Sequence, residues 1–271
     1  MWFARFVSGR TLVTHGPRER GGALPSRAQW SKERAEALLS SGYWFGDLPE
    51  AFRRTLIERC EIRTFKRNNP LYRIGDAVDG MYAVLEGDLR AYIYGDDKEP
   101  ILLRLIGPAA WFGEFHLIDD YPTRTFEIRA CSDCATLFLA KKDFNEIANA
   151  SLDNYKQFIK LTCIATRFLV RIAVEARSDA QRKAARALLR IARMHGRDTG
   201  SGTEITINLT QSDLASLIGV SRQYVNELIA GWNDEGLVQW RGSAAPVVFI
   251  DQMKTLLSPL DEWMLESQGW A

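Results

Sequence analysis

The segment that most constrains the fold is residues 209–232, LTQSDLASLIGVSRQYVNELIAGW, whose pattern predicts two short helices joined by a tight turn. Thr210 can cap the first helix, with Asp213 as its partner in a capping box. Gly219 ends this helix, because glycine readily adopts the left-handed conformation that follows many helices. Ser221 caps the second helix. By spacing alone, the segment is equally typical of a helix-turn-helix and of an ordinary helical hairpin.

The second helix has an apolar face and a polar face. Val225, Leu228 and Ile229 are three and four residues apart and must point inward. Polar residues at the start of the helix then point outward, where the recognition helix of a helix-turn-helix contacts base edges. In that case Arg222 is expected to read a guanine, and Gln223 or Asn226 an adenine. The full set of expected DNA contacts is Thr210, Gln211, Ser221, Arg222, Gln223, Tyr224 and Asn226.

Residues 211–228 resemble, position by position, the helix-turn-helix signature of the Crp/Fnr family of bacterial transcription regulators, over Q-S-D-L-A-x-L-I-G-V-S-R-Q-x-V-N-x-L. The resemblance implies a sequence-specific regulator that acts as a homodimer on a pseudo-palindromic DNA operator. It also implies RNA polymerase as a partner if the protein is an activator. The alternative is a nucleotide-binding regulatory subunit whose C-terminal helices mediate protein–protein contacts.

One part of the second helix departs from the resembled family. Members that bind cyclic AMP carry Ser-Arg-Glu there, followed by a second arginine that contacts bases. This chain keeps Ser221 and Arg222 but has Gln223 and Glu227 in the other two positions. Because Glu227 cannot donate a hydrogen bond to guanine, we expect the operator to differ from theirs.

Length and charge limit the class of protein. The 271 residues suffice for two domains, and 46% of them are hydrophobic, enough to fill two cores. The formal net charge of +1 provides no overall attraction to nucleic acid, so phosphate contacts must come from a few placed cations. No apolar run is long enough to span a bilayer, and we expect a cytoplasmic protein with no membrane partner. The sequence also contains no recognisable catalytic motif, which argues against an enzyme.

The cysteines and histidines give no clear metal site. Cys131 and Cys134 have the spacing of half a zinc or redox site, but no second pair accompanies them. The iron–sulfur sensors of the resembled family gather their cysteines near the N-terminus, whereas the first cysteine here is Cys60. His116 stands alone among aromatic residues, which is typical of a hydrogen-bonded core side chain. We therefore expect no metal, iron–sulfur cluster or haem.

The fold class expected is α+β, with an N-terminal β-roll like the jelly roll of cyclic-nucleotide-binding domains. Residues 1–29, rich in Arg and Gly, are expected to form a flexible tail. Residues 30–150 should then form the roll, since many short strands with glycine-bearing turns are typical of a roll or barrel. Its strands are predicted at 63–66, 71–73, 81–85, 89–94, 101–105, 125–130 and 136–139, and its helices at 32–39, 50–60 and 141–150.

Two short segments of the roll resemble the phosphate-binding cassette of the same family. They are Phe112-Gly113-Glu114 and Arg124-Thr125. The resemblance implies that backbone N–H groups near Gly113 and Arg124 bind a cyclic phosphate, that Glu114 accepts from a ribose hydroxyl, and that Thr125 donates to phosphate or base.

Other positions count against a cyclic nucleotide. His116 and Phe126 stand where the family usually has small residues, beside the space for the phosphate. Phe168 and Leu169 fall at the positions that contact adenine in the resembled family. The ligand therefore stays unknown: a cyclic nucleotide, another small molecule in a reshaped pocket, or none.

Residues 151–177 should form a long dimerisation helix, predicted at 152–176. One stripe has the spacing of a two-stranded coiled-coil seam, and a second stripe, which includes Phe158 and Leu161, runs beside it. Two stripes need two partners, the roll of the same chain and the equivalent helix of a second copy. A helix buried inside a monomer is the alternative. The seam residues are Tyr155, Ile159, Thr162, Thr166, Leu169 and Ala173.

Residues 178–258 are expected to form a winged helix-turn-helix domain. A helix at 180–195, capped by Asp179, precedes a loop at 197–202 and a strand at 204–208. A β-hairpin formed by 236–240 and 247–250 supplies the wing, and a helix at 251–257 follows. Residues 259–271 form a C-terminal tail for which the sequence suggests no role.

Overall fold

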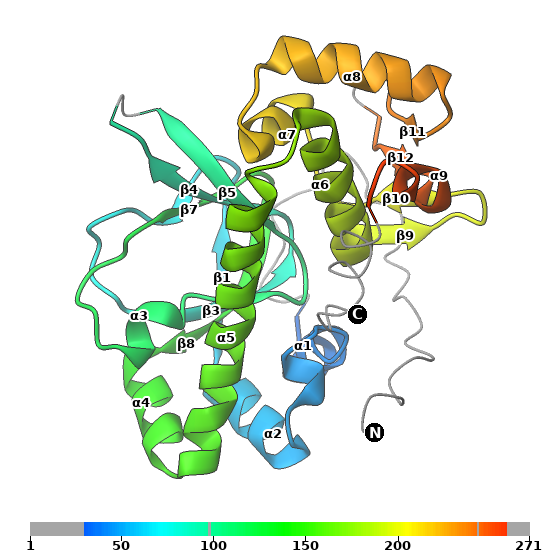
Figure 1. Ribbon diagram of the computed structural model, residues 1–271. Coiled ribbons are helices and arrows are strands. Elements are labelled where there is room, and N and C mark those ends of the chain that lie inside the picture. The colour runs from blue at the N-terminus through cyan, green and yellow to red at the C-terminus, as the bar shows by residue number, and fades with distance from the viewer. Residues whose placement is uncertain (1–29, 97–98, 243, 259–271) are drawn as a thin grey trace, which may run out of the picture.

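The computed structural model describes residues 30–96, 99–242 and 244–258. It contains a β-roll with flanking helices, the long helix α5 (Leu152–Glu175) and a C-terminal domain built on α6, α7 and α8 (Figure 1). The tails expected at 1–29 and 259–271 lie outside the described residues. Within the described ranges, no helix has both the length and the apolar character needed to cross a membrane.

The roll consists of two antiparallel four-stranded sheets, with strand orders β1-β8-β3-β6 and β2-β7-β4-β5. The strands are β1 (Glu61–Phe65), β2 (Pro70–Tyr72), β3 (Gly80–Glu86), β4 (Leu89–Tyr94), β5 (Pro100–Ile106), β6 (Trp111–Phe112), β7 (Glu127–Ala130) and β8 (Cys134–Ala140). The surrounding helices are α1 (Lys32–Leu39), the short 3-10 helix η2 (Phe45–Asp47), α2 (Glu50–Arg59), α3 (Phe115–Ile118) and α4 (Lys141–Asn149).

The predicted strands correspond to seven of these eight, and β4 has the predicted bounds. Strand β6 and helix α3 are not predicted from the sequence, because elements of two and four residues are too short to show a repeated period. Strand β3 is buried over nearly its whole length, since one of its faces lies between the two sheets and the other lies under the helices.

Helix α5 packs on the roll through the second of its two predicted stripes. Phe158 and Leu161 are buried in the core cluster that also contains Phe52 and Phe144. The rings of Phe144 and Phe158 are 4.4 Å apart, centroid to centroid. This contact joins α5 to α4, and the ring of Phe52 in α2, 5.5 Å from that of Phe158, joins it to α2. The stripe therefore anchors the long helix to its own roll.

The C-terminal domain is a winged helix, with a sheet of strand order β11-β12-β10-β9. Its core gathers Leu188, Leu214, Val225, Ile229 and Trp232, each with no more than 1% of its surface exposed. The elements are α6 (Ala180–His195), β9 (Gly196–Asp198), β10 (Thr203–Ile205), α7 (Gln211–Ile218), α8 (Arg222–Asp234), β11 (Val238–Gln239), β12 (Val247–Val248) and α9 (Ile250–Lys254).

The loop predicted at 197–202 and the strand predicted at 204–208 need correction. Strand β9 begins at Gly196 and pairs with β10, which ends at Ile205. Beyond it the backbone N–H of Thr206 donates to the carbonyl of His195, and that of Leu209 to Ile207, instead of continuing the ladder. The chain therefore leaves the sheet early and turns into α7.

Candidate nucleic-acid interface and sensor site

Local hydrogen bonds form the two helices as the sequence predicts. The side chain of Thr210 accepts from the N–H of Asp213, and the carboxylate of Asp213 accepts from the N–H of Thr210, which completes the capping box. Gly219 ends α7 with φ 72° and ψ 42°, the left-handed conformation. The hydroxyl of Ser221 accepts from the N–H of Tyr224 and caps α8. The helix-turn-helix thus owes its shape to three short-range hydrogen bonds and one left-handed glycine.

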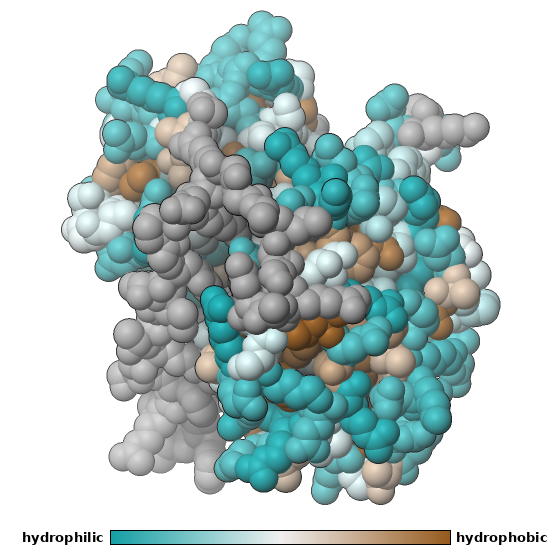
Figure 2. Space-filling view, turned by 180° about the vertical axis from the view of Figure 1, so that it is seen from behind, coloured by the Kyte–Doolittle hydropathy of each residue, from teal (hydrophilic) through white to brown (hydrophobic). Residues whose placement is uncertain are grey.

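Helix α8 lies at the edge of the molecule, away from the roll (Figure 1). In the view from behind, the end of the molecule that carries α8 is largely hydrophilic (Figure 2). Of the seven expected DNA contacts, Gln211 is half-buried and the other six are exposed. The exposed six are Thr210, Ser221, Arg222, Gln223, Tyr224 and Asn226.

Helix α7 is attached to the roll through Asp213, a contact that the sequence does not predict. Arg90 of β4 donates from Nε and Nη2 to the two carboxylate oxygens, at 2.8 and 2.5 Å. The side chains of Arg90 and Asp213 are only 12% and 10% exposed. Ser216 of α7 also accepts from the backbone N–H of Leu102 in β5, at 3.0 Å. The same carboxylate therefore caps α7 and docks it on the roll.

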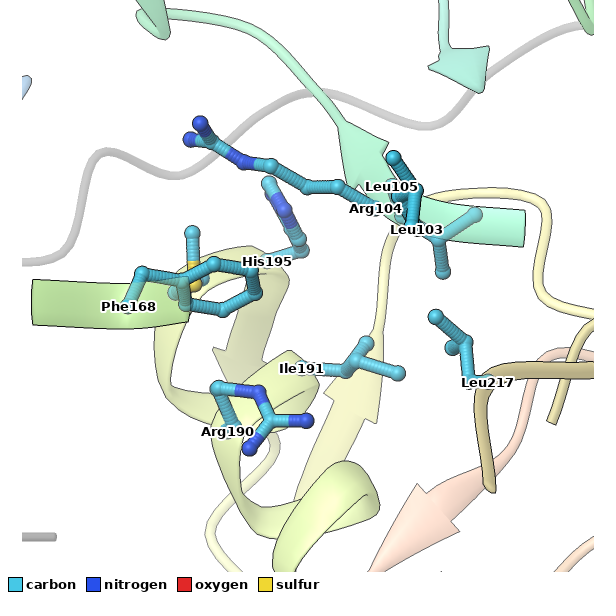
Figure 3. A pocket seen from close by; sticks show the side chains of 9 residues that line it. Leu103, Arg104, Leu105, Phe168, Arg190, Ile191, His195 and Leu217 are labelled. Carbon is cyan, nitrogen blue, oxygen red and sulfur yellow. The ribbon is translucent and has the colours of Figure 1, made fainter. Parts of the chain in front are cut away.

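A small pocket lies where β5, α5, α6 and α7 meet (Figure 3). The ring of Phe168 has the guanidinium of Arg104 at 5.6 Å and that of Arg190 at 5.4 Å from its centroid. Burial and the nearby charge of Arg104 lower the pKa of His195 to about 3, so this imidazole is neutral. The pocket is lined by Leu103, Arg104, Leu105, Phe168, Arg190, Ile191, Met194, His195 and Leu217.

Charged groups also meet at the end of α5, next to this pocket. The carboxylate of Glu175 accepts from Arg171 at 2.8 Å and from Arg190 of α6 at 2.9 Å. Arg186 donates to the hydroxyl of Ser178 in the linker between these helices, at 2.7 Å. No local pattern in the sequence indicates this network, which connects the long helix α5 to α6, the first helix of the C-terminal domain.

The cassette expected to bind a cyclic phosphate is bonded internally. The guanidinium of Arg124 is fully buried and donates to the carboxylate of Asp79 at 2.9 Å and to the carbonyl of Gly113 at 3.1 Å. It also lies 4.2 Å from the ring centroid of Tyr72. Because Asp79 supplies the negative charge that a phosphate would bring, Arg124 is not presented to a ligand.

Of the remaining cassette residues, Gly113 and Glu114 are buried, and Thr125 is exposed but bonded to His116. The Nε2 atom of His116 lies 2.9 Å from the hydroxyl of Thr125 and accepts from the N–H of Thr125 at 3.2 Å. His116 is thus a buried, hydrogen-bonded core side chain, as its aromatic surroundings suggest. Burial raises the pKa of Glu114 to about 7. In this arrangement the residues do not fit a cyclic nucleotide.

The remaining residues expected at the ligand and dimer sites lie on α5, some buried against the rest of the chain and others at its surface. Phe168 belongs to the pocket between the domains, whereas Leu169 is 49% exposed on α5. Tyr155 lies at the start of the expected seam but packs on its own roll, with its hydroxyl donating to the carbonyl of Ile118 at 3.1 Å. The later seam residues turn outward: Ile159 and Thr162 are half-buried, and Thr166, Leu169 and Ala173 are exposed.

The four cysteines are unpaired, and three of them, Cys60, Cys131 and Cys134, are buried. Burial raises the pKa of Cys131 to about 12 and that of Cys134 to about 11, which keeps both as thiols. Among the described residues, no group of three or more His, Cys, Asp or Glu side chains is arranged to hold a metal ion.

Comparisons with known proteins match both halves of the chain. Residues 62–151 match the model of the cyclic nucleotide-binding domain, and residues 182–258 that of the Crp-like helix-turn-helix domain. A relative in Mycobacterium tuberculosis, strain H37Rv, described as a CRP-like cAMP-activated global transcriptional regulator, is 26% identical over 217 residues, which cover 77% of this chain and 93% of the relative.

Solved structures share the fold at low sequence identity. FixK2 from Bradyrhizobium japonicum superposes with a TM-score of 0.65 at 14% identity, over 73% of this chain and 98% of that one. The c-di-GMP responsive global regulator CLP from Xanthomonas campestris gives a TM-score of 0.60 at 19% identity, over 74% and 99%. A mutant of CooA from Carboxydothermus hydrogenoformans gives 0.60 at 16%, over 78% and 92%.

A roll of the cyclic-nucleotide-binding type, followed by a long helix and a winged helix-turn-helix, defines a class of two-domain transcription regulators. Helix α8, with its capped start and exposed polar residues, is the element that such a regulator places on DNA. The chain belongs to the Crp/Fnr family and is a DNA-binding transcription regulator.

Proposed function

We propose that the protein binds a pseudo-palindromic operator as a homodimer, with one copy of α8 in each of two successive major grooves. The observation that carries this proposal is the exposed, polar N-terminal end of α8, a helix whose inward residues Val225, Ile229 and Trp232 are buried. A two-fold symmetric dimer then reads two half-sites about 34–36 Å apart. Such a dimer would act in the cytoplasm and, if it activates transcription, would contact RNA polymerase.

The exposed side of α5 supports the dimer. Leu169 and Val170 are 49% and 59% exposed in the single chain, on a helix whose opposite side is buried in the roll. Exposed apolar residues on a long helix are stabilised by pairing with the same helix of a second copy. Leu169→Glu should therefore give a monomer in analytical ultracentrifugation, whereas Lys160→Glu should leave the dimer intact, because Lys160 lies off the seam. A dimeric Leu169→Glu protein would contradict the proposed interface.

The role of Arg222 tests the proposed contact with DNA. Arg222→Ala should weaken operator binding by about 1–3 kcal/mol and relax the preference at one base pair of each half-site. A gel-shift series over single-base operator variants measures this. Arg54→Ala removes another exposed cation, in α2 of the roll, and serves as the control. If Arg222→Ala weakened binding equally on every sequence, the arginine would contact phosphate instead of a base.

The internally bonded cassette leads us to propose that no cyclic nucleotide switches this regulator. Arg124 and Thr125 would each have to exchange a protein partner for the ligand. A ligand present at 100 times its dissociation constant would raise the unfolding free energy by about 2.7 kcal/mol. A thermal-shift screen with cyclic AMP, cyclic GMP and cyclic dinucleotides should therefore show no shift. A shift with any of them would show that the cassette opens to admit that ligand.

A further inference from the structure

Acceptors outnumber cations on the exposed face of the recognition helix. Arg222 is the one basic residue within α8, which also carries the acidic residues Glu227 and Asp234. Glu227 is exposed and lies one helical turn after Gln223. The amide nitrogen Nε2 of Gln223 donates to Oε1 of Glu227 at 3.1 Å. The two side chains thus form one unit in the middle of the exposed face.

This pairing determines what the unit can offer to a base. An ionised carboxylate only accepts hydrogen bonds. One N–H of the Gln223 amide is donated to Glu227 and holds the carboxylate in place, while the amide keeps its acceptor Oε1 and a second N–H. The bidentate contact between glutamine and adenine uses Oε1 and one N–H, so the pair with Glu227 does not prevent it, and the group of this unit that offers acceptors alone is the carboxylate of Glu227.

In the major groove, acceptors on the protein must meet donors on the DNA. Guanine and thymine present only acceptors there, whereas adenine and cytosine each present an amino group. In adenine that amino group stands beside the N7 acceptor, which a carboxylate would repel. Cytosine carries no acceptor edge next to its N4 amino group, and glutamate is a known partner of that group.

We propose that Glu227, held by Gln223, is a specificity-determining residue that selects cytosine in each half-site through the N4 amino group. The inference rests on the proposed function, because it requires α8 to lie in the major groove. Arg222, at the start of the same face, reads guanine through donors, and Glu227 reads cytosine through acceptors. The alternative is that Glu227 and Gln223 form an ordinary pair on the surface of a helix.

The experiment is selection of binding sites from a random DNA library by the full chain and by two variants. Glu227→Gln removes the charge with almost no change in shape. Glu235→Gln makes the same change at the exposed C-terminal end of α8 and is the matched control. We expect the wild type and Glu235→Gln to select the same inverted repeat, containing a strongly preferred cytosine in each half-site. Glu227→Gln should select the same repeat without that preference.

Binding constants measured on the selected site and on its single-base variants give the size of the effect. Replacing the cytosine should weaken wild-type binding about tenfold, within the range of one specific base contact. For Glu227→Gln this ratio should fall close to one, while affinity for the selected site is kept or increases, because a negative charge near the phosphates is gone. A surface pair without contact to DNA would not alter the ratio.

The outcomes separate the inference from the function on which it rests. If none of the three proteins, the wild type included, selects a DNA sequence, the proposed operator binding is wrong. If all three proteins select one repeat with the same preference at every position, operator binding stands and the role of Glu227 is overturned. A uniform loss of affinity in Glu227→Gln, with base preferences unchanged, also overturns it, since that result would indicate only a change in the helix itself.

Discussion

Replacing Arg90 with alanine should loosen the attachment of α7 to the roll. The two side chains of the Arg90–Asp213 ion pair are nearly buried, and the pair has two short N–O contacts. Removing one partner of a buried ion pair costs about 3–5 kcal/mol when the other charge is left uncompensated. Here Asp213 keeps hydrogen bonds from the backbone N–H and the hydroxyl of Thr210. We therefore expect a loss of about 2 kcal/mol in unfolding free energy.

Urea unfolding of the wild type, Arg90→Ala, Asp213→Ala and the double variant measures this interaction. The double-mutant cycle is needed because Asp213→Ala also removes the capping box, and the cycle isolates the coupling between the two side chains. Hydrogen exchange across 211–218 should also become faster in Arg90→Ala, since α7 loses its main polar contact with the roll.

Arg54→Ala provides a control in α2, on the roll. Arg54 pairs with Glu50, and the two side chains are 65% and 71% exposed. An exposed ion pair contributes about 0–1 kcal/mol, so this variant should be nearly as stable as the wild type. A coupling energy below about 0.5 kcal/mol between Arg90 and Asp213, or unchanged hydrogen exchange in α7, would refute the reasoning.

Three further predictions concern single groups. Thr210→Ala should lower the unfolding free energy by about 1 kcal/mol through loss of the helix cap, measured by urea unfolding. The raised pKa of Glu114, about 7 against 4.5, means that the folded state holds a proton that the unfolded state releases, so stability falls as pH rises between these values. The unfolding free energy of Glu114→Gln should therefore exceed that of the wild type by up to about 3 kcal/mol above pH 7 and equal it below pH 4.5. Equal stability of the two proteins at both pH values would contradict this. The lowered pKa of His195, about 3 against 6.5, means that the neutral ring stabilises the fold above pH 6.5, and that this contribution is lost as pH falls toward 3. Thermal unfolding of His195→Leu should show a weaker dependence on pH across this range.

Much of the architecture could be predicted from the sequence because it depends on interactions between near neighbours. The helix-turn-helix is formed by Thr210 with Asp213, by Gly219 and by Ser221, all within a few residues of the groups they bond. The inward stripe of α5 follows from the period of a helix, and its buried residues Phe158 and Leu161 were identified from spacing. Elements shorter than one period, such as β6, left no such pattern.

The state of the sensor site was decided by the tertiary structure alone. The sequence shows Gly113, Arg124 and Thr125 in a cassette typical of phosphate binding, but not which partners they have. The fold brings Asp79, 45 residues away in the chain, to the guanidinium of Arg124, and so satisfies internally the charge that a ligand would have met. A cation has the same sequence signature whether it faces a ligand or a carboxylate of its own chain.

The contact between the two domains, unlike the helix-turn-helix, could not be predicted from the sequence, because it joins residues that are far apart in the chain. Arg90 and Asp213 are 123 residues apart, and no pattern in either segment predicts that they form a contact. The sequence by itself determined the caps, the turn and the buried faces, because these depend on spacing along one element. Only the tertiary structure decided which charged side chains meet, because those pairs form after distant elements have packed together and excluded water from between them.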